Sequence, residues 1–209
     1  MNNKKQHLNE EILLSINKEN PDTENYLIPE EIGRKARSFM SIKWDLEDAR
    51  TAFEELSVMI LMNDGHEVIR TALWKSAIIT YGRCFSNSED GGQSKLEIKE
   101  CFKDAKYYIP IHSSLINIRN GYIAHRGINE FEETVLFMKV DSKEPEAATF
   151  AMKSFRATTS SFKNLVDYQN VIEHLQAYVE QRIESSCIKL MATYIRAKLK
   201  IVRMNQCSK

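Results

Sequence analysis

The chain has 209 residues, 43% of them hydrophobic and 28% charged, and its 29 basic and 29 acidic residues give a formal net charge of zero. This composition is that of a globular protein with one sizeable core, and only seven glycines and four prolines argue against a loop-rich all-β fold. Zero net charge excludes a global field that would draw the chain onto nucleic acid or a membrane, so any such binding must be local.

The N-terminal residues 1–30 are polar, and the segment NPDTEN interrupts them. This pattern predicts a polar N-terminal leader segment that contains no more than a short helix. The remaining residues 31–209 predict one helical domain. No apolar run is long enough for a signal peptide or a membrane span, so we expect a cytoplasmic protein without membrane contact.

Apolar residues with three-or-four spacing predict most of the elements in this domain. The expected helices run from Asp45 to the NDG turn at 63–65, from Val68 to about Phe85, over about 96–105 and over 111–125. The segment SNSEDGGQSK at 86–95 predicts a loop, but it lacks the GxxxxGK[ST] order of a phosphate-binding loop.

The period of the pattern changes after Gly127. The β-forming runs TVLFMKV and ATFAMKSF flank DSKEPEA, which predicts a β-hairpin insert at 134–155. Helical spacing then returns from Tyr168 to Leu199 and predicts a helix of roughly 35 residues. Such a helix would be about 50 Å long, so it must kink, protrude or pack against a second subunit.

The end of the chain is basic. No acidic residue follows Glu184, whereas six basic residues do: Lys189, Arg196, Lys198, Lys200, Arg203 and Lys209. Cations suit the negative end of a helix dipole, so a solvated basic helix end is the simpler interpretation. Contact with RNA or with a partner protein is the alternative.

The four cysteines are widely spaced, with no CxxC pair and no histidine at metal-ligand spacing. They predict neither a zinc site nor a disulfide framework. We expect no metal and no cofactor.

The segment IRNGYIAHRG at 118–127 places polar residues within an apolar helix. At about 100° per residue, Arg119 falls about 80° from Ile111, beside the apolar stripe and away from the solvated face. Burying an unpaired guanidinium costs on the order of several kcal/mol. Arg119 therefore needs a carboxylate, for example from the helix at 45–55, a subunit interface, or an anionic ligand such as phosphate.

Three further polar residues are candidates on weaker grounds. His125 has the side chain best suited to proton transfer near neutral pH, although a histidine beside Gly127 also suits a helix C-terminus. Arg83 could reach a substrate phosphate if its helix borders the site. His112 could support the same site, or it could be a hydrogen-bonded structural histidine.

The residues RNGYIAH at 119–125 resemble the R-x4-6-H motif of the HEPN superfamily, whose members often carry a polar residue directly after the arginine, as Asn120 is here. The resemblance implies an all-α, HEPN-like helical bundle that forms a homodimer and cleaves RNA without a metal. It implies that His125 acts as general acid or base and that Arg119 stabilises charge on the phosphorane. Asn120 would orient the scissile phosphate or the histidine.

Arg119 and His125 lie about 120° apart on one α-helix, which favours a site shared by two subunits. The resemblance further implies a toxin or phage-defence role and a regulatory or antitoxin partner. The alternative is a non-catalytic HEPN-like helical dimer that acts as a scaffold, a nucleotide-binding module or an RNA-binding module.

Overall fold

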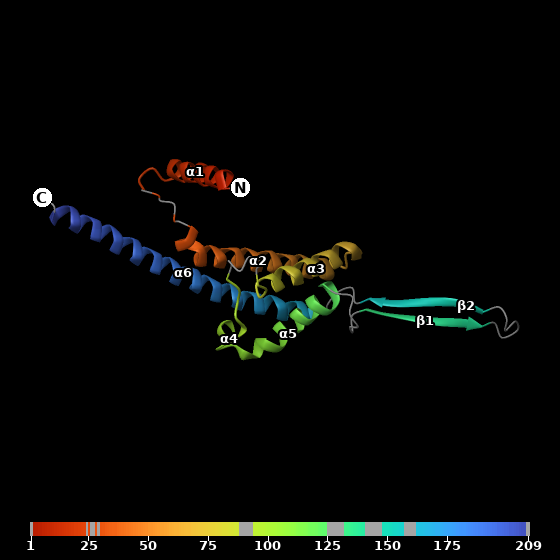
Figure 1. Ribbon diagram of the computed structural model, residues 1–209. Coiled ribbons are helices and arrows are strands. Elements are labelled where there is room, and N and C mark those ends of the chain that lie inside the picture. The colour runs from red at the N-terminus through yellow and green to blue at the C-terminus, as the bar shows by residue number, and fades with distance from the viewer. Residues whose placement is uncertain are drawn as a thin grey trace.

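The structure is a computed structural model that describes residues 2–23, 25, 28, 30–87, 94–124, 132–140, 148–156 and 162–207. The described chain is mostly helical, and in Figure 1 a body of helices carries a projecting β-hairpin at one end. The elements are α1 (Asn2–Glu19), α2 (Glu30–Leu61), α3 (Glu67–Arg83), α4 (Ile98–Cys101), the 3-10 turn η1 (Lys106–Tyr108), α5 (Ile109–Ile118), the π-helix η2 (Arg119–Ala124), β1 (Glu132–Val140), β2 (Ala148–Arg156) and α6 (Phe162–Cys207).

The core lies where α2 packs along α6. Both helices bury one apolar stripe with three-or-four spacing, as an amphipathic helix must to remove that stripe from water. The buried residues are Phe39, Ile42, Leu46, Ala49, Phe53 and Leu56 on α2, and Leu165, Tyr168, Val171, Ile172, Leu175 and Val179 on α6.

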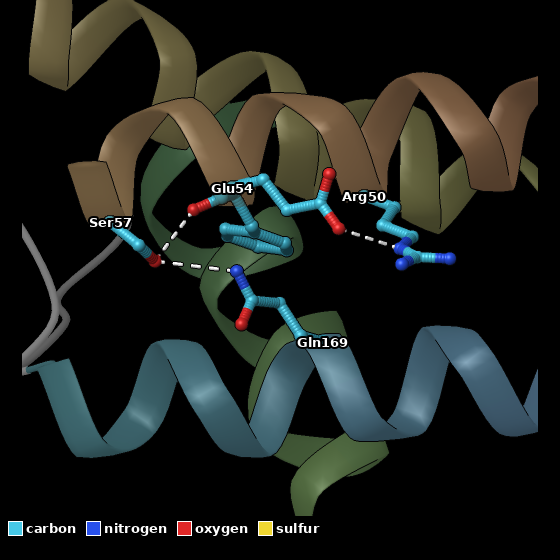
Figure 2. Close-up of polar contacts among 5 residues, drawn as sticks. Arg50, Glu54, Ser57 and Gln169 are labelled. Carbon is cyan, nitrogen blue, oxygen red and sulfur yellow. Dashed lines mark hydrogen bonds and ion pairs between the residues drawn. The ribbon is translucent and has the colours of Figure 1, made fainter. Parts of the chain in front are cut away.

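Polar contacts show that α2 and α6 run antiparallel. Near the end of α2, the Oγ atom of Ser57 accepts a hydrogen bond of 3.3 Å from Gln169 on α6 and donates one of 2.8 Å to the carbonyl of Phe53 (Figure 2). Nearer the start of α2, Lys43 pairs with Glu180 at 2.7 Å. The two contacts therefore fix the alignment of the helices from both ends of the seam.

The helix α3 returns along α2 after a turn in which Asn63 adopts a φ of 51°, in the left-handed region that asparagine tolerates. It buries Trp74, Ala77, Ile78 and Tyr81 in the same core. The sequence prediction of this turn and of the helix after it is confirmed.

The predicted start of the first core helix at Asp45 is wrong, because α2 begins at Glu30. Phe39 and Ile42, only 4% and 5% exposed, continue the stripe of Leu46 toward the N-terminus. The charged residues between them, Lys43 and Asp45, lie at the edges of the stripe and pair with Glu180 and Arg83, so they do not interrupt the helix. Other bounds also shift, since α1 has 18 residues, more than the short helix expected, and α4 has only four.

The hairpin predicted at 134–155 is confirmed as an antiparallel pair of strands, 132–140 and 148–156. The predicted C-terminal helix is longer than expected, because α6 has 46 residues. Among the α6 side chains that the structure describes, which end at Thr193, the last buried one is Val179, and the C-terminal part of the helix extends past the start of α2 in Figure 1. No described helix is both long enough and apolar enough to cross a membrane.

The unequal burial of α6 predicts unequal sensitivity to mutation. Leu175, 0% exposed, lies in the seam, so Leu175→Ala should lower the free energy of unfolding by about 2–5 kcal/mol. Met191, 62% exposed, lies on the protruding half, and Met191→Ala should change it by less than about 0.5 kcal/mol. Urea denaturation followed by circular dichroism measures both values. Equal losses would contradict this account of the core.

Candidate functional site

The candidate motif begins where α5 ends. Leu115 and Ile118, 0% and 3% exposed, anchor α5 in the core. The chain then continues as the π-helix η2, whose i→i+5 hydrogen bonds widen the turn and occur frequently at functional sites. The prediction of one regular α-helix over 111–125 is therefore wrong after Ile118. The angle of about 120° between Arg119 and His125 requires 3.6 residues per turn, so it does not apply to this π-helix.

Arg119 packs against the backbone of α3 at Gly82. A Cβ atom added at Gly82 would lie 2.8 Å from Nε and 3.3 Å from Cγ of Arg119 and still closer to its Cδ. These separations are shorter than ordinary van der Waals contact, so only a glycine leaves room for the arginine stem at this position. Gly82 thereby helps to determine where the guanidinium lies.

The guanidinium of Arg119 is partly buried and bonds to its neighbour in the motif. Its Nη1 donates a hydrogen bond of 2.9 Å to Oδ1 of Asn120, whose side chain is exposed. Among the described residues, no carboxylate lies within ion-pair distance of it. Of the three partners expected for Arg119, the carboxylate from the helix at 45–55 is therefore absent, while another internal carboxylate, a subunit interface and a phosphate stay predictions.

Arg83 has a different environment from the neighbouring Gly82. Its side chain is 64% exposed, and its guanidinium lies 3.5 Å from the carboxylate of Asp45 on α2. The two residues line a small pocket of about 250 Å³, to which Ser41 and Ser86 add hydroxyl groups. Burial raises the pKa of Asp45, and the charge of Arg83 opposes that rise. A substrate-binding role for Arg83 stays a prediction.

His112 belongs to the core. It is 3% exposed, shares a hydrogen bond of 2.8 Å between its Nδ1 and the hydroxyl of Tyr81, and contacts the ring of Phe85 at 4.3 Å between centroids. Burial lowers its pKa to about 4, so the ring is neutral at physiological pH. Of the two roles expected for His112, this burial favours the structural one, because the ring has almost no surface that a substrate could touch; a supporting role at the site stays a prediction.

His125 lies outside the described residues, so its proximity to Arg119 stays a prediction. Gly82 is the residue that the sequence analysis missed. An isolated glycine inside a helical pattern costs about 1 kcal/mol relative to alanine and usually has a packing reason. That was the available signal, but the pattern alone does not identify the side chain that needs the space.

Within the described ranges, no three histidine, cysteine, aspartate or glutamate side chains are grouped closely enough to hold a metal ion. The chain matches no protein-family model, no curated protein and no solved structure. The contacts of the motif residues are therefore the basis for a proposed function.

The contact between Gly82 and Arg119 can be tested with a double-mutant cycle. In an Arg119→Ala background, Gly82→Ala should leave the free energy of unfolding unchanged or raise it by up to about 1 kcal/mol, because alanine is the better helix former. In the wild-type background the new Cβ must displace Arg119, so the same change should be less favourable. Urea denaturation of the four proteins gives the coupling, and identical effects in both backgrounds would refute the contact.

His112 predicts a loss of stability in acid. Its folded pKa of about 4 lies below the ordinary value of about 6.5, so the unfolded chain binds more protons between these values. The free energy of unfolding should therefore fall as the pH drops from about 6.5 to 4, by on the order of 3 kcal/mol from this group.

The matched variant for this prediction is Tyr81→Phe combined with His112→Leu, which removes both partners of the buried hydrogen bond and leaves neither unsatisfied. Urea denaturation across the pH range should show a shallower acid loss in this variant. An unchanged pH dependence would assign the loss to other groups.

Proposed function

We propose that this protein is a metal-independent endoribonuclease whose site contains Arg119, Asn120 and His125. The observation that supports it best is the environment of Arg119. The guanidinium is held against Gly82, bonds to the exposed Asn120 and has no carboxylate partner among the described residues. A positioned guanidinium without an acidic partner is well suited to bind a phosphate group, because its forked donors match phosphate oxygens.

The proposed reaction uses the ribose 2′-hydroxyl as nucleophile. A general base removes the proton of the 2′-hydroxyl, O2′ forms a bond to the adjacent phosphorus, and the bond from phosphorus to O5′ breaks. A general acid then protonates O5′, which leaves a 2′,3′-cyclic phosphate and a 5′-hydroxyl. DNA should not react because it lacks this hydroxyl.

Each motif residue has one role in this reaction. His125 transfers a proton, a contribution of typically about 10²- to 10⁴-fold. Arg119 stabilises the negative charge that develops on the phosphorane, where a preorganised cation is most effective. Asn120, through its bond to Arg119, orients the guanidinium and the scissile phosphate.

The resemblance of the motif also supports a homodimeric assembly and a cellular role. Two subunits of an all-α, HEPN-like homodimer would bring their motifs to one shared cleft. The RNA-cleaving activity of such an enzyme must be restrained in the cell. This suits a cytoplasmic toxin or phage-defence effector whose activity is held back by a regulatory or antitoxin partner.

One observation favours the scaffold as a second candidate. The residues Leu136 and Met152 pair across the hairpin and are 63% and 73% exposed, and Met138 on the same face is 56% exposed. A two-stranded ribbon is marginally stable alone in water, so an exposed apolar face on it suits contact with another protein. A scaffold would bind through this face and cleave nothing.

The cleavage test uses labelled total RNA in EDTA with four proteins: wild type, Arg119→Ala, His125→Ala and Asn117→Ala. Asn117 is exposed on α5, two residues before Arg119, and serves as the control for folding and purity. We expect wild type and the control to cleave and both motif variants to lose about 100-fold or more of the rate. The ends should be 2′,3′-cyclic phosphates.

Equal cleavage by all four proteins would identify a contaminating nuclease. No cleavage by a well-folded wild type across transfer, ribosomal and messenger RNA would favour the scaffold. DNA of the same sequence should stay intact throughout.

A further inference from the structure

A groove lies between the first turns of α2 and the middle of α6, residues 182–193, with a volume of about 320 Å³. The start of α2, which lines the groove, lies at the opposite end of the helical body from the hairpin and the π-helix η2 (Figure 1). Because α2 and α6 are antiparallel, the start of α2 lies beside residues that are more than a hundred positions later in the chain. The groove is therefore a product of the fold and separate from the Arg119 site.

Three cations line this groove: Lys35 from α2, and Arg182 and Lys189 from α6. Arg182 lies 3.7 Å from Glu100 and over the ring of Phe39, which holds it in place. Lys35 and Lys189 are exposed, and neither pairs with a carboxylate within the described part of the chain. No acidic residue is among the described residues of the lining.

The charge distribution of the whole chain strengthens this observation. The six basic residues after Glu184 leave 23 basic and 29 acidic residues in the rest of the chain, a net charge of −6 against +6. Zero net charge therefore conceals a strongly polarised molecule. The groove lies where the basic part of α6 begins, so its field should attract an anion locally.

We propose that this groove binds the phosphate backbone of single-stranded RNA, as a second contact that is distant from the cleavage site. Lysine, arginine and hydroxyl side chains are the groups that most often contact phosphates in nucleic-acid complexes, and Ser185 adds a hydroxyl beside the three cations. Such contacts are independent of base sequence and give affinity to a flexible polyanion.

RNA fits these observations better than an acidic helix of another protein. Among the described residues of the lining, the three apolar side chains are Ile32, Ala36 and Leu190, and the other six carry a positive charge or a hydroxyl group. A docked helix gains most of its affinity from a continuous apolar groove. The inference rests on the proposed function for its biological meaning, since a polymer substrate can contact both ends of the molecule.

The test measures binding without cleavage. The probe is a fluorescent single-stranded oligoribonucleotide in which every 2′-hydroxyl is methylated, so no nucleophile is present. Dissociation constants are measured by anisotropy over a range of salt concentrations for wild type, for Lys35→Gln with Lys189→Gln, and for Lys99→Gln with Lys103→Gln. Lys99 and Lys103 are exposed outside the groove, so this control removes the same charge.

We expect the groove variant to bind about tenfold more weakly at low salt and its slope of log affinity against log salt to be shallower by about 1.4, the value for two lost phosphate contacts on a single strand. The control should retain the wild-type slope. Lys35→Arg with Lys189→Arg should restore binding, which a loss of folding would not allow.

Equal binding by the groove variant and the control would overturn the proposal. Binding of poly-L-glutamate but not of the oligonucleotide would also overturn it, in favour of an acidic protein partner. Because the probe cannot be cleaved, groove-dependent binding by a protein without nuclease activity would refute the proposed reaction and leave the groove established.

Discussion

The packing of α2 along α6 is the contact on which the other elements depend. Each helix has one apolar stripe, and neither stripe can be removed from water without the other helix. The helix α3 lies against α2, and α6 contacts the short α4 segment, where His174 bonds to the carbonyl of Cys101 at 2.8 Å and stacks on Phe102. Without the seam, the surfaces that position α3 and α5 would not exist.

The candidate site follows from that core by short steps. Tyr81 is fully buried on α3, which sets the position of the adjacent Gly82 against the start of η2. Ile118 is buried at the end of α5, which brings the stem of Arg119 onto Gly82. Burial of a large aliphatic side chain contributes about 1.5–3 kcal/mol, enough to hold an adjacent arginine in a partly buried place. The packing of apolar side chains in the core thus preorganises the guanidinium of Arg119, which lies at the edge of that core.

The long helix α6 separates two cationic regions that the proposals assign to one ligand. Its N-terminal part completes the core beside the Arg119 site, and its middle part contributes Arg182 and Lys189 to the groove. A helix rises about 1.5 Å per residue, so a continuous α6 acts as a spacer of nearly constant length. A polymer that contacts both regions would be oriented along this helix. A small ligand could not contact both regions at once.

The sequence by itself determined the helical class, the turn at Asn63, the hairpin and the amphipathic stripes of α3 and α6, because these depend on local periodicity and turn chemistry. It also identified Arg119 as a candidate, since an arginine beside an apolar stripe needs a partner, and the resemblance of the motif added Asn120. Only the tertiary structure decided that Asp45 pairs with Arg83, that His112 is a core residue and that Gly82 makes room for Arg119. Each of these contacts joins residues from separate helices, and one-dimensional spacing carries no information about which helix faces pack together.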